Sequence, residues 1–541
     1  MDLNKNTMNK QDTQKRILVA TLISFAFFMA YDFFYLQPQQ QLQAQQAKNK
    51  VVQTNTTNGV TNTKQAPQVM QQNNNATVSK SVKTDNFSDI ITTIQTKSSV
   101  ITIDALGRIS QVTLKAKQYI DKDGKAINLF TKDQLKPLEV RFEDSKLNDE
   151  AFKTKVTTSA TSLDVINGAK TLTLTQTLST TTLTKVLKFY PDGHYDIDVK
   201  TSNNQNFFIT PGYRPNVLVD MYADHGALVL KNDATLEVIK DKKADETKQF
   251  VGINAVSQFD RYYTTVLYNF QKNLQVTIMP DDNQSPQAFI HVLTKINLHG
   301  YLGPKEHTIL KALDPRLTDL IEYGWFTFIA KPMFLLLQFI YNIIGNWGWT
   351  IVATTMLIKL VLYPLSYKGM VSMNRLKELS PKVKAIQEKY KDDKQKASAK
   401  MMELYKKEGA NPMGGCLPMI MQIPVFFALY RVLLNAIELK GSGWILWIHD
   451  LASMDPYFVL PVFMGITMFV QQKITPNQMQ DATQKKIFQF LPVIFTVMMA
   501  WFPAGLTLYW TVNNLFTVAQ QYYINKIFEA KKLKKAIVKD S

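Results

Sequence analysis

Hydrophobic and polar positions divide the chain into zones, and the first zone is a long apolar run. Residues 17–36 carry a single charge, Asp32, and about 20 apolar residues suffice to cross a bilayer as a helix. The run is longer than the apolar part of a cleaved signal peptide, and no small-residue cleavage motif follows it, so it predicts an uncleaved anchor. Because Lys15 and Arg16 precede it, we expect residues 1–16 in the cytoplasm and the next zone outside.

The second zone is polar at first and then alternates with a period of two. Residues 37–85 are rich in Gln and Asn and bury too little apolar surface to fold, which predicts a disordered linker. Residues 86–322 contain short alternating runs, such as 171–189, separated by turns such as Pro191-Asp192-Gly193. Many short strands with frequent turns predict an all-β sandwich or barrel.

Two groups of Asp and His residues occur in this β-rich zone. They are His194 with Asp192, Asp196 and Asp198, and His225 with Asp220 and Asp224. A metal site or an acid–base pair is conceivable. However, no spacing is specific for either, and a hairpin turn with solvated flanks accounts for the same composition. We expect no catalytic or metal site here.

The third zone is apolar and predicts a bundle of membrane helices. Residues 323–343, interrupted by Lys331-Pro332, predict an amphipathic helix lying along the outer membrane surface. Five further apolar runs predict transmembrane helices at residues 344–366, 416–436, 456–471, 487–502 and 505–524. With the anchor, they make a six-span α-helical bundle attached to an outer β domain.

The polar segments between these runs set the predicted topology. Residues 367–415 predict a helical hairpin, with one helix starting at Ser380-Pro381 and a second at Asp392-Asp393. Its charges either dock a partner or merely solvate it. The other segments are an outer loop at 437–455, a cytoplasmic loop at 472–486 and a basic cytoplasmic tail at 525–541. Basic and poorly basic segments alternate, which places the hairpin and the C-terminus in the cytoplasm.

Composition changes this picture in two ways. The 541 residues include 62 Lys and Arg against 44 Asp and Glu, a net charge of +18. Because the excess lies mainly in the cytoplasmic segments, it sets the topology and faces anionic lipid, and it makes the hairpin and tail candidates for contact with ribosomal RNA. The single cysteine, Cys416, excludes a disulfide scaffold and a cysteine-based metal cluster.

One charge, Lys359, lies inside an apolar run. A charged side chain at bilayer depth costs about 2.5–3.5 kcal/mol, so it usually faces protein or water. From this run alone, snorkelling to the inner interface is an equal alternative. Thr355 lies one turn away, and polar residues recur in other runs: Gln422, Tyr509, Asn513, Thr517 and either Gln520 or Gln521. We therefore predict a shared hydrated cavity, and the lack of acidic residues in these later runs argues against a proton relay.

Longer motifs carry a family resemblance. They are NPMGGCLPMIMQIPVFFALY at 411–430, WILWIHDLASMDPYFVLP at 444–461, WFPAGLTLYW at 501–510, GNWGW at 345–349 and YPLS at 363–366. Together they closely resemble the YidC family of bacterial membrane protein insertases, over essentially the whole chain. The resemblance implies an inner-membrane protein with a periplasmic β-supersandwich, the Gram-negative form of the outer domain, whose fold is related to sugar-binding domains.

The resemblance also implies a mechanism. The family has a hydrophilic groove, open to the cytoplasm and to lipid, with an Arg where this chain has Lys359, and commonly Tyr-Tyr where this chain has Tyr509-Trp510. The charge is kept, but the bidentate fork is lost. The groove would attract acidic residues of a nascent chain, whose apolar segment then slides past Phe426, Tyr430 and Met464 into lipid.

The expected partners follow from the same resemblance. They are nascent membrane proteins, the Sec translocon and its accessory subunits, the ribosome and anionic lipids, and we expect a monomeric core that is not an enzyme. No cofactor is expected, and the chain has no nucleotide-binding GxxxxGK[ST] motif. A solute transporter and a membrane-anchored periplasmic carbohydrate-binding protein stay open as alternatives. A transporter of this kind usually has internal repeats, and none is visible in the sequence.

Overall fold

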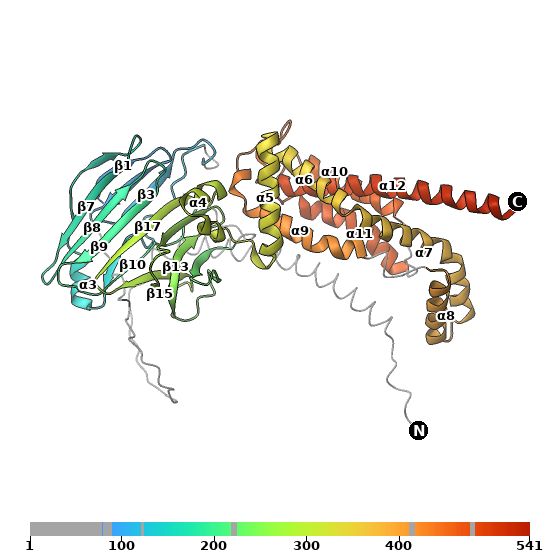
Figure 1. Cartoon of the computed structure of the whole chain (residues 1–541), viewed down its shortest axis with the longest axis horizontal. Helices are drawn as coiled ribbons and strands as arrows, with labels where there is room; N and C mark the ends of the chain where they lie inside the picture. The colour runs from blue at the N-terminus through green and yellow to red at the C-terminus, as the bar shows by residue number, and fades with distance from the viewer. Residues whose placement is uncertain are drawn as a thin grey trace, which may run out of the picture. The chain divides into compact units, whose positions relative to one another are not determined.

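The structure is a computed structural model. It describes residue 78 and residues 89–120, 124–217, 224–409, 417–475 and 482–540. Side chains are described in these ranges except at residues 325, 394, 417–421, 482–487 and 532–540. The predicted segments 1–16 and 17–36, and the linker 37–85 apart from Val78, lie outside the described residues. Figure 1 shows that the chain builds strands first and helices afterwards.

The β-rich part consists of two sheets. Strands β3-β2-β1-β6 form a four-stranded sheet, and the other strands form a thirteen-stranded sheet whose main path runs from β4 to β5. The strands are β1 (Ile90–Gln95), β2 (Ser99–Asp104), β3 (Ile109–Leu114), β4 (Val140–Phe142), β5 (Thr157–Thr158), β6 (Ser162–Asp164), β7 (Lys170–Thr177), β8 (Thr182–Phe189), β9 (Tyr195–Thr201), β10 (Phe207–Ile209), β11 (Gly226–Lys231), β12 (Leu236–Lys240), β13 (Lys248–Phe259), β14 (Tyr263–Tyr268), β15 (Leu274–Pro280), β16 (Pro286–Val292) and β17 (Lys295–Pro304).

Alternation along the strands explains why the two sheets share one core. In β8, Leu183, Leu187 and Phe189 are buried while the residues between them are more exposed, apart from the buried Lys185. They pack in one hydrophobic cluster with Ile101 of the smaller sheet. Such side-chain alternation follows from the period of a strand. The predicted β-rich domain is therefore confirmed.

Several of the Asp and His residues of this domain pair with one another, and Asp220 lies outside the described residues. His194 Nδ1 lies 2.5 Å from Asp192 Oδ1, and its ring stacks on Tyr190 at 4.1 Å between centroids. Asp196 lies 2.6 Å from His299 Nδ1. Within the described ranges, no group of three or more His, Cys, Asp or Glu side chains is arranged to hold a metal ion.

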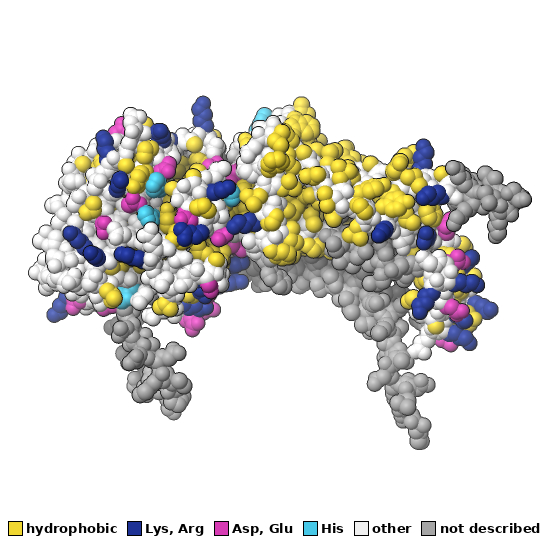
Figure 2. Space-filling view, in the orientation of Figure 1, with side chains coloured by type: hydrophobic (Ala, Val, Ile, Leu, Met, Phe, Trp, Pro, Cys, Tyr) yellow, Lys and Arg dark blue, Asp and Glu magenta, His cyan; other side chains and the backbone are white. Residues whose placement is uncertain are grey.

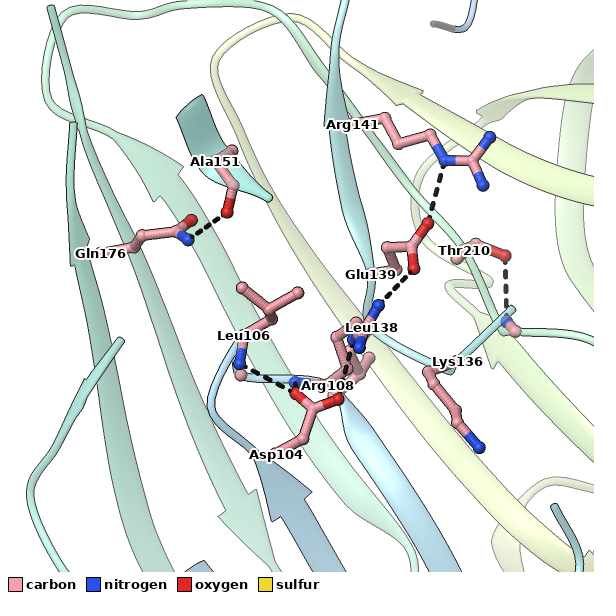
Figure 3. A network of polar contacts seen from close by, with 12 residues as sticks. Asp104, Leu106, Arg108, Lys136, Leu138, Glu139, Arg141, Ala151, Gln176 and Thr210 are labelled. Carbon is pink, nitrogen blue, oxygen red and sulfur yellow. Dashed lines mark hydrogen bonds and ion pairs between the residues drawn. The ribbon is translucent and has the colours of Figure 1, made fainter. Parts of the chain in front are cut away.

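A buried polar network crosses the same domain (Figure 3). Arg108 links two carboxylates, because its Nε lies 2.8 Å from Asp104 Oδ2 and its Nη1 lies 2.9 Å from Glu139 Oε2. Lys185 Nζ, from β8, donates to the backbone oxygens of Gly107 at 2.9 Å and Leu138 at 2.8 Å. This network ties the β2–β3 turn to the segment before β4 and to β8.

Helices make up most of the rest. They are α3 (Ser145–Ala151), inserted in the β-rich part, then α4 (His307–Leu313), η3 (Pro315–Leu320), η4 (Gly324–Phe326), α5 (Thr327–Ile344), α6 (Trp347–Val361), α7 (Tyr363–Lys389), α8 (Lys394–Lys407), α9 (Leu417–Asn435), η5 (Ile437–Leu439), α10 (Val459–Ile474), α11 (Ala482–Met499) and α12 (Ala504–Asp540). Figure 2 shows apolar side chains gathered over the visible surface of the helical part, and charged ones over the β-rich part and the end of the hairpin. An apolar surface of this extent fits a lipid environment.

Three predicted boundaries differ from the structure. The run predicted as one helix over 344–366 is broken at Leu362, where α6 and α7 meet at 64°, because Pro364 sits in the first turn of a new helix. The predicted helix start at Ser380-Pro381 is wrong, since α7 continues through it to Lys389. The run predicted over 505–524 and the tail 525–541 form one helix that continues to Asp540.

Packing explains why α7 continues through Pro381. Leu376, Leu379 and Val383 lie on one face of α7 and pack against Met401 of α8. This face extends on both sides of the proline, so tertiary contacts hold the helix together where the local sequence favours a break. The second helix starts as predicted, with the Asp393 side chain accepting a hydrogen bond from Lys396 N.

Among the described residues, α5 alone is long and apolar enough to cross a membrane as a single straight helix. The bent pair α6 and α7 passes the same test when it is taken as one span. Shorter apolar helical stretches are present at Gln422–Asn435, Val459–Ile474 and Phe488–Met499. Within the described residues, length and composition therefore identify fewer spans than the five predicted there.

Candidate functional site

The candidate site starts from the buried face of α6. Thr355 and Lys359 are one helical turn apart, and both are buried with Ile351 on the side that faces the other helices. Asn346 starts this helix by accepting a hydrogen bond from Trp349 N at 3.0 Å. The cap and the apolar run determine the register of α6, and the register turns Lys359 inward.

Lys359 is held by neutral groups from two other helices. Its Nζ donates to Thr517 Oγ1 of α12 at 2.9 Å and to Gln422 Oε1 of α9 at 3.3 Å. Gln422 Nε2 in turn donates to Asn513 Oδ1 of α12 at 2.5 Å. Only 7% of Lys359 is exposed, and no acidic side chain in the described part of the chain forms an ion pair with it. The cation is therefore hydrogen-bonded but not neutralised.

A small, partly open cavity lies beside this cation. Its polar lining includes predicted residues from three helices, namely Thr355, Lys359, Gln422, Tyr509 and Asn513. Further lining comes from Leu362, Leu365 and Ser366, at the bend between α6 and α7. Sequence reasoning missed these residues, although Pro364 within the apolar run was a signal for the bend. The cavity lining is thus a mixture of polar and apolar side chains.

Aromatic side chains stand next to the cavity on α9 and α12. The ring centroid of Phe426 lies 4.6 Å from that of Trp510 and 6.3 Å from those of Tyr509 and Tyr430. Trp510 also contacts Phe495 of α11, at 5.4 Å. These contacts connect three helices through one aromatic cluster.

Two of the predicted site residues are less available to a substrate than we expected. Met464 of α10 is completely buried in the helix core and does not line the cavity. The Thr355 hydroxyl donates to Ile351 O of its own helix at 2.6 Å, so its hydrogen is already used. The structure therefore brings together the cation, the amides and the aromatic residues, but not Met464.

The arrangement of these side chains suits recognition of an anionic or polar group. A buried ammonium with neutral partners attracts an anionic group, because no carboxylate in the described part of the chain competes for it. Amide and hydroxyl groups around it offer both donors and acceptors to a polar chain. Among the described residues, the cavity lining contains no carboxylate, thiol or imidazole.

Family models match nearly all of the described chain. A model described as "60Kd inner membrane protein" matches residues 339–532. A second, described as "YidC periplasmic domain", matches residues 91–336. The boundary between the two matches falls inside α5.

Full-length relatives match as well. The chain is 50% identical over 532 residues to the membrane protein insertase YidC of Campylobacter jejuni, covering 98% of this chain and 99% of the relative. It is 45% identical over 531 residues to that of Wolinella succinogenes, covering 97% of each chain. A solved structure of an active YidC insertase with its first transmembrane domain resolved aligns with a TM-score of 0.36 and 18% identity, covering 81% of this chain and 95% of that one.

Proposed function

The chain belongs to the YidC family of membrane protein insertases, and from this premise we propose how it handles its substrates. It is an inner-membrane insertase, and the cavity beside Lys359 is the place where the polar part of a nascent membrane protein is received. The observation that carries this proposal is the set of neutral partners around a buried cation. Lys359 contacts Thr517 and Gln422 but has no internal counter-ion among the described residues.

The physical obstacle to insertion is desolvation. Moving polar and charged groups of a nascent chain across hydrocarbon is opposed by their loss of hydration. A polar cavity that reaches partway across the membrane shortens the apolar path. Lys359 attracts an acidic residue of the moving segment, while Gln422 and Asn513 bond to its polar groups.

Release follows from hydrophobic partitioning. The apolar segment of the substrate passes the aromatic cluster of Phe426, Tyr430 and Trp510 and moves into lipid, where burial of apolar surface is favourable. Met464 is fully buried, so we assign it to helix packing and not to the surface along which the substrate moves.

The membrane arrangement is part of the proposal. We infer that α5 lies along the outer surface, because it runs crosswise to α9, α10 and α12 (Figure 1). Lys331, near its start, lies 2.6 Å from Asp319 of η3. Helices α6, α9, α10, α11 and α12, together with residues 17–36, then supply six spans, with the α7–α8 hairpin and both termini in the cytoplasm.

The partners are proposed on the same basis. The Lys-rich hairpin and the basic end of α12 fit the ribosome and anionic lipids, because both present phosphate groups. The Sec translocon and its accessory subunits are proposed as neighbours for part of the substrate range. The core works as a monomer.

Charge reversal at Lys359 tests the proposal. Lys359→Glu, reconstituted into proteoliposomes, is expected to insert a substrate with an acidic tail about tenfold less well, because attraction becomes repulsion. Lys359→Arg keeps the charge and serves as the matched control. Unchanged insertion of the acidic-tailed substrate by Lys359→Glu would overturn the role of the cation, and the family membership would stand.

A further inference from the structure

The helix that carries Gln422 is fastened at its far end to the β-rich part of the chain. Residue Arg261, in the turn between β13 and β14, donates from Nε to Leu434 O at 2.9 Å. Leu434 is among the last residues of α9, whose final carbonyls have no donor within the helix. A cation at a helix C-terminus also complements the helix dipole. The outer domain thus caps this helix.

Further contacts surround the same end of α9. Asn435 Nδ2 donates to Glu322 O at 3.1 Å, and Glu438 Oε1 accepts from His307 N at 3.0 Å. Lys440 Nζ donates to Ile120 O at 3.1 Å. These bonds join three separate segments of the outer domain to the last residue of α9 and the short stretch of chain that follows it.

Apolar packing strengthens the attachment. Ile437, just after α9, is 2% exposed and belongs to the hydrophobic core of the β-rich domain. Leu429, Val432 and Leu433 of α9 share a second cluster with Phe259 of β13. The end of α9 is therefore part of the same packed interior as the strands.

We propose that the outer β domain positions α9, and through it the Gln422 wall of the groove, with Arg261 as a positioning residue. Gln422 and Leu434 are on one helix, about 18 Å apart at the usual rise of 1.5 Å per residue. A shift or tilt at the capped end therefore moves Gln422 relative to Asn513 and Lys359. The consequence for insertion rests on the proposed function, but the placement of α9 does not.

Distance measurement between α9 and α12 tests the placement directly. Spin labels at Ile423 of α9 and Leu515 of α12, both exposed, report the separation of these helices in the full chain with Cys416→Ser. Arg261→Met is expected to broaden or shift the distance distribution by several ångströms, because the cap and its hydrogen bond are lost. Insertion is expected to fall about threefold.

A matched control separates positioning from general damage. Arg214 is as buried as Arg261 but lies 2.5 Å from Asp241 within the β domain. Arg214→Met is expected to leave the α9–α12 distances unchanged. If Arg261→Met does not fold, Lys440→Met provides a second test. It removes a more exposed contact near the end of α9, so a smaller shift in distance is expected.

The outcomes are distinguishable. Unchanged distances in Arg261→Met, or in Lys440→Met where only that variant folds, overturn the proposal, and so does an equal change in Arg214→Met. Altered distances with wild-type insertion support the placement of α9 but contradict the role of Gln422 in the groove. Altered distances with reduced insertion support both.

Discussion

Two of the buried lysines, Lys185 and Lys359, lie in different regions of the protein, and their surroundings differ. Lys185 of the β domain is bonded to two backbone oxygens and stands near the carboxylates of Asp104 and Glu139. Lys359 of the helical part is bonded to a hydroxyl and an amide, with no carboxylate partner among the described residues. Carboxylates near Lys185 offset part of the cost of burying its charge, whereas Lys359 has no such carboxylate among the described residues and is available to an outside anion.

The network around Lys185 shows what structural compensation looks like. Glu139 accepts from Arg108 at 2.9 Å and from Arg141 at 3.0 Å, and all these side chains are largely buried (Figure 3). Burial lowers the pKa of Lys185 to about 8, against the opposing effect of Asp104. Such a network specifies how segments meet, and losing one member leaves the others unsatisfied.

The largest expected change in stability comes from replacing Lys185. Lys185→Met leaves the oxygens of Gly107 and Leu138 buried without this donor, so we expect a loss of about 3 kcal/mol in the free energy of unfolding of the β domain. Denaturant unfolding of the full chain in detergent, followed by far-UV circular dichroism, measures it. Lys188→Met, at an exposed position of the same strand, is expected to change stability by less than about 0.5 kcal/mol. Equal losses in both variants would contradict this assignment.

The pH dependence of stability is the next largest effect. Because the pKa of Lys185 is lowered from 10.5 to about 8 in the folded chain, the unfolded chain binds more protons between these values. Stability contributed by this residue therefore rises as pH increases from 8 to 10.5, by up to about 3 kcal/mol. The same denaturation series at several pH values, compared with Lys185→Met, isolates the effect. A difference that stays constant over this range would refute it.

Removing the other lysine is expected to cost function and not stability. Lys359→Met deletes a buried charge whose partners are neutral, so we expect the free energy of unfolding to stay within about 1 kcal/mol of wild type or to increase. Insertion of a substrate with an acidic tail is expected to fall about fivefold, and that of a neutral-tailed one to change little. If Lys359→Met lost as much stability as Lys185→Met, the proposed difference between the two lysines would be wrong.

The smallest expected effect concerns one neutral partner. Thr517→Val removes the hydroxyl that lies 2.9 Å from Lys359 Nζ and keeps the shape of the side chain, so insertion is expected to fall about twofold. Thr511→Val is the control, because its hydroxyl bonds to Thr507 O within α12. Initial insertion rates in proteoliposomes compare the two. The same small loss in both variants would assign the effect to helix packing.

Local patterns determined much of this protein. The period of two in residues 171–189 predicts the strands, and β7 and β8 lie there. Apolar runs locate α6, α9, α10 and α11 to within about five residues, and they locate the start of α12 but not its end. The one-turn spacing of Thr355 and Lys359 puts both on the buried face of α6. These features were predictable because the spacing of hydrophobic residues reflects local geometry, which depends only on residues close together in the sequence.

Only the tertiary structure decided between neighbouring candidates. Sequence left open whether Gln520 or Gln521 continues the polar stripe of α12. In the structure Gln521 Nε2 donates to Asn525 Oδ1 of the same helix at 2.7 Å, and Asn525 also accepts from Asn374 of α7 at 2.8 Å, so Gln521 supports the residue that links α12 to α7. Helical periodicity alone places both glutamines near the polar face of α12. Which of them contacts a neighbouring polar residue depends on the helix that packs beside each.

The groups that surround Lys185 and Lys359 were also decided by tertiary contacts. In sequence, Lys185 is one of two lysines in an alternating strand, whereas Lys359 is the single charge in an apolar run. The carboxylates near Lys185 belong to residues 104 and 139, and the neutral partners of Lys359 belong to residues 422 and 517. Sequence determines which charges are buried, through hydrophobic pattern. Packing of distant segments determines whether each charge is neutralised, because that depends on contacts no local pattern records.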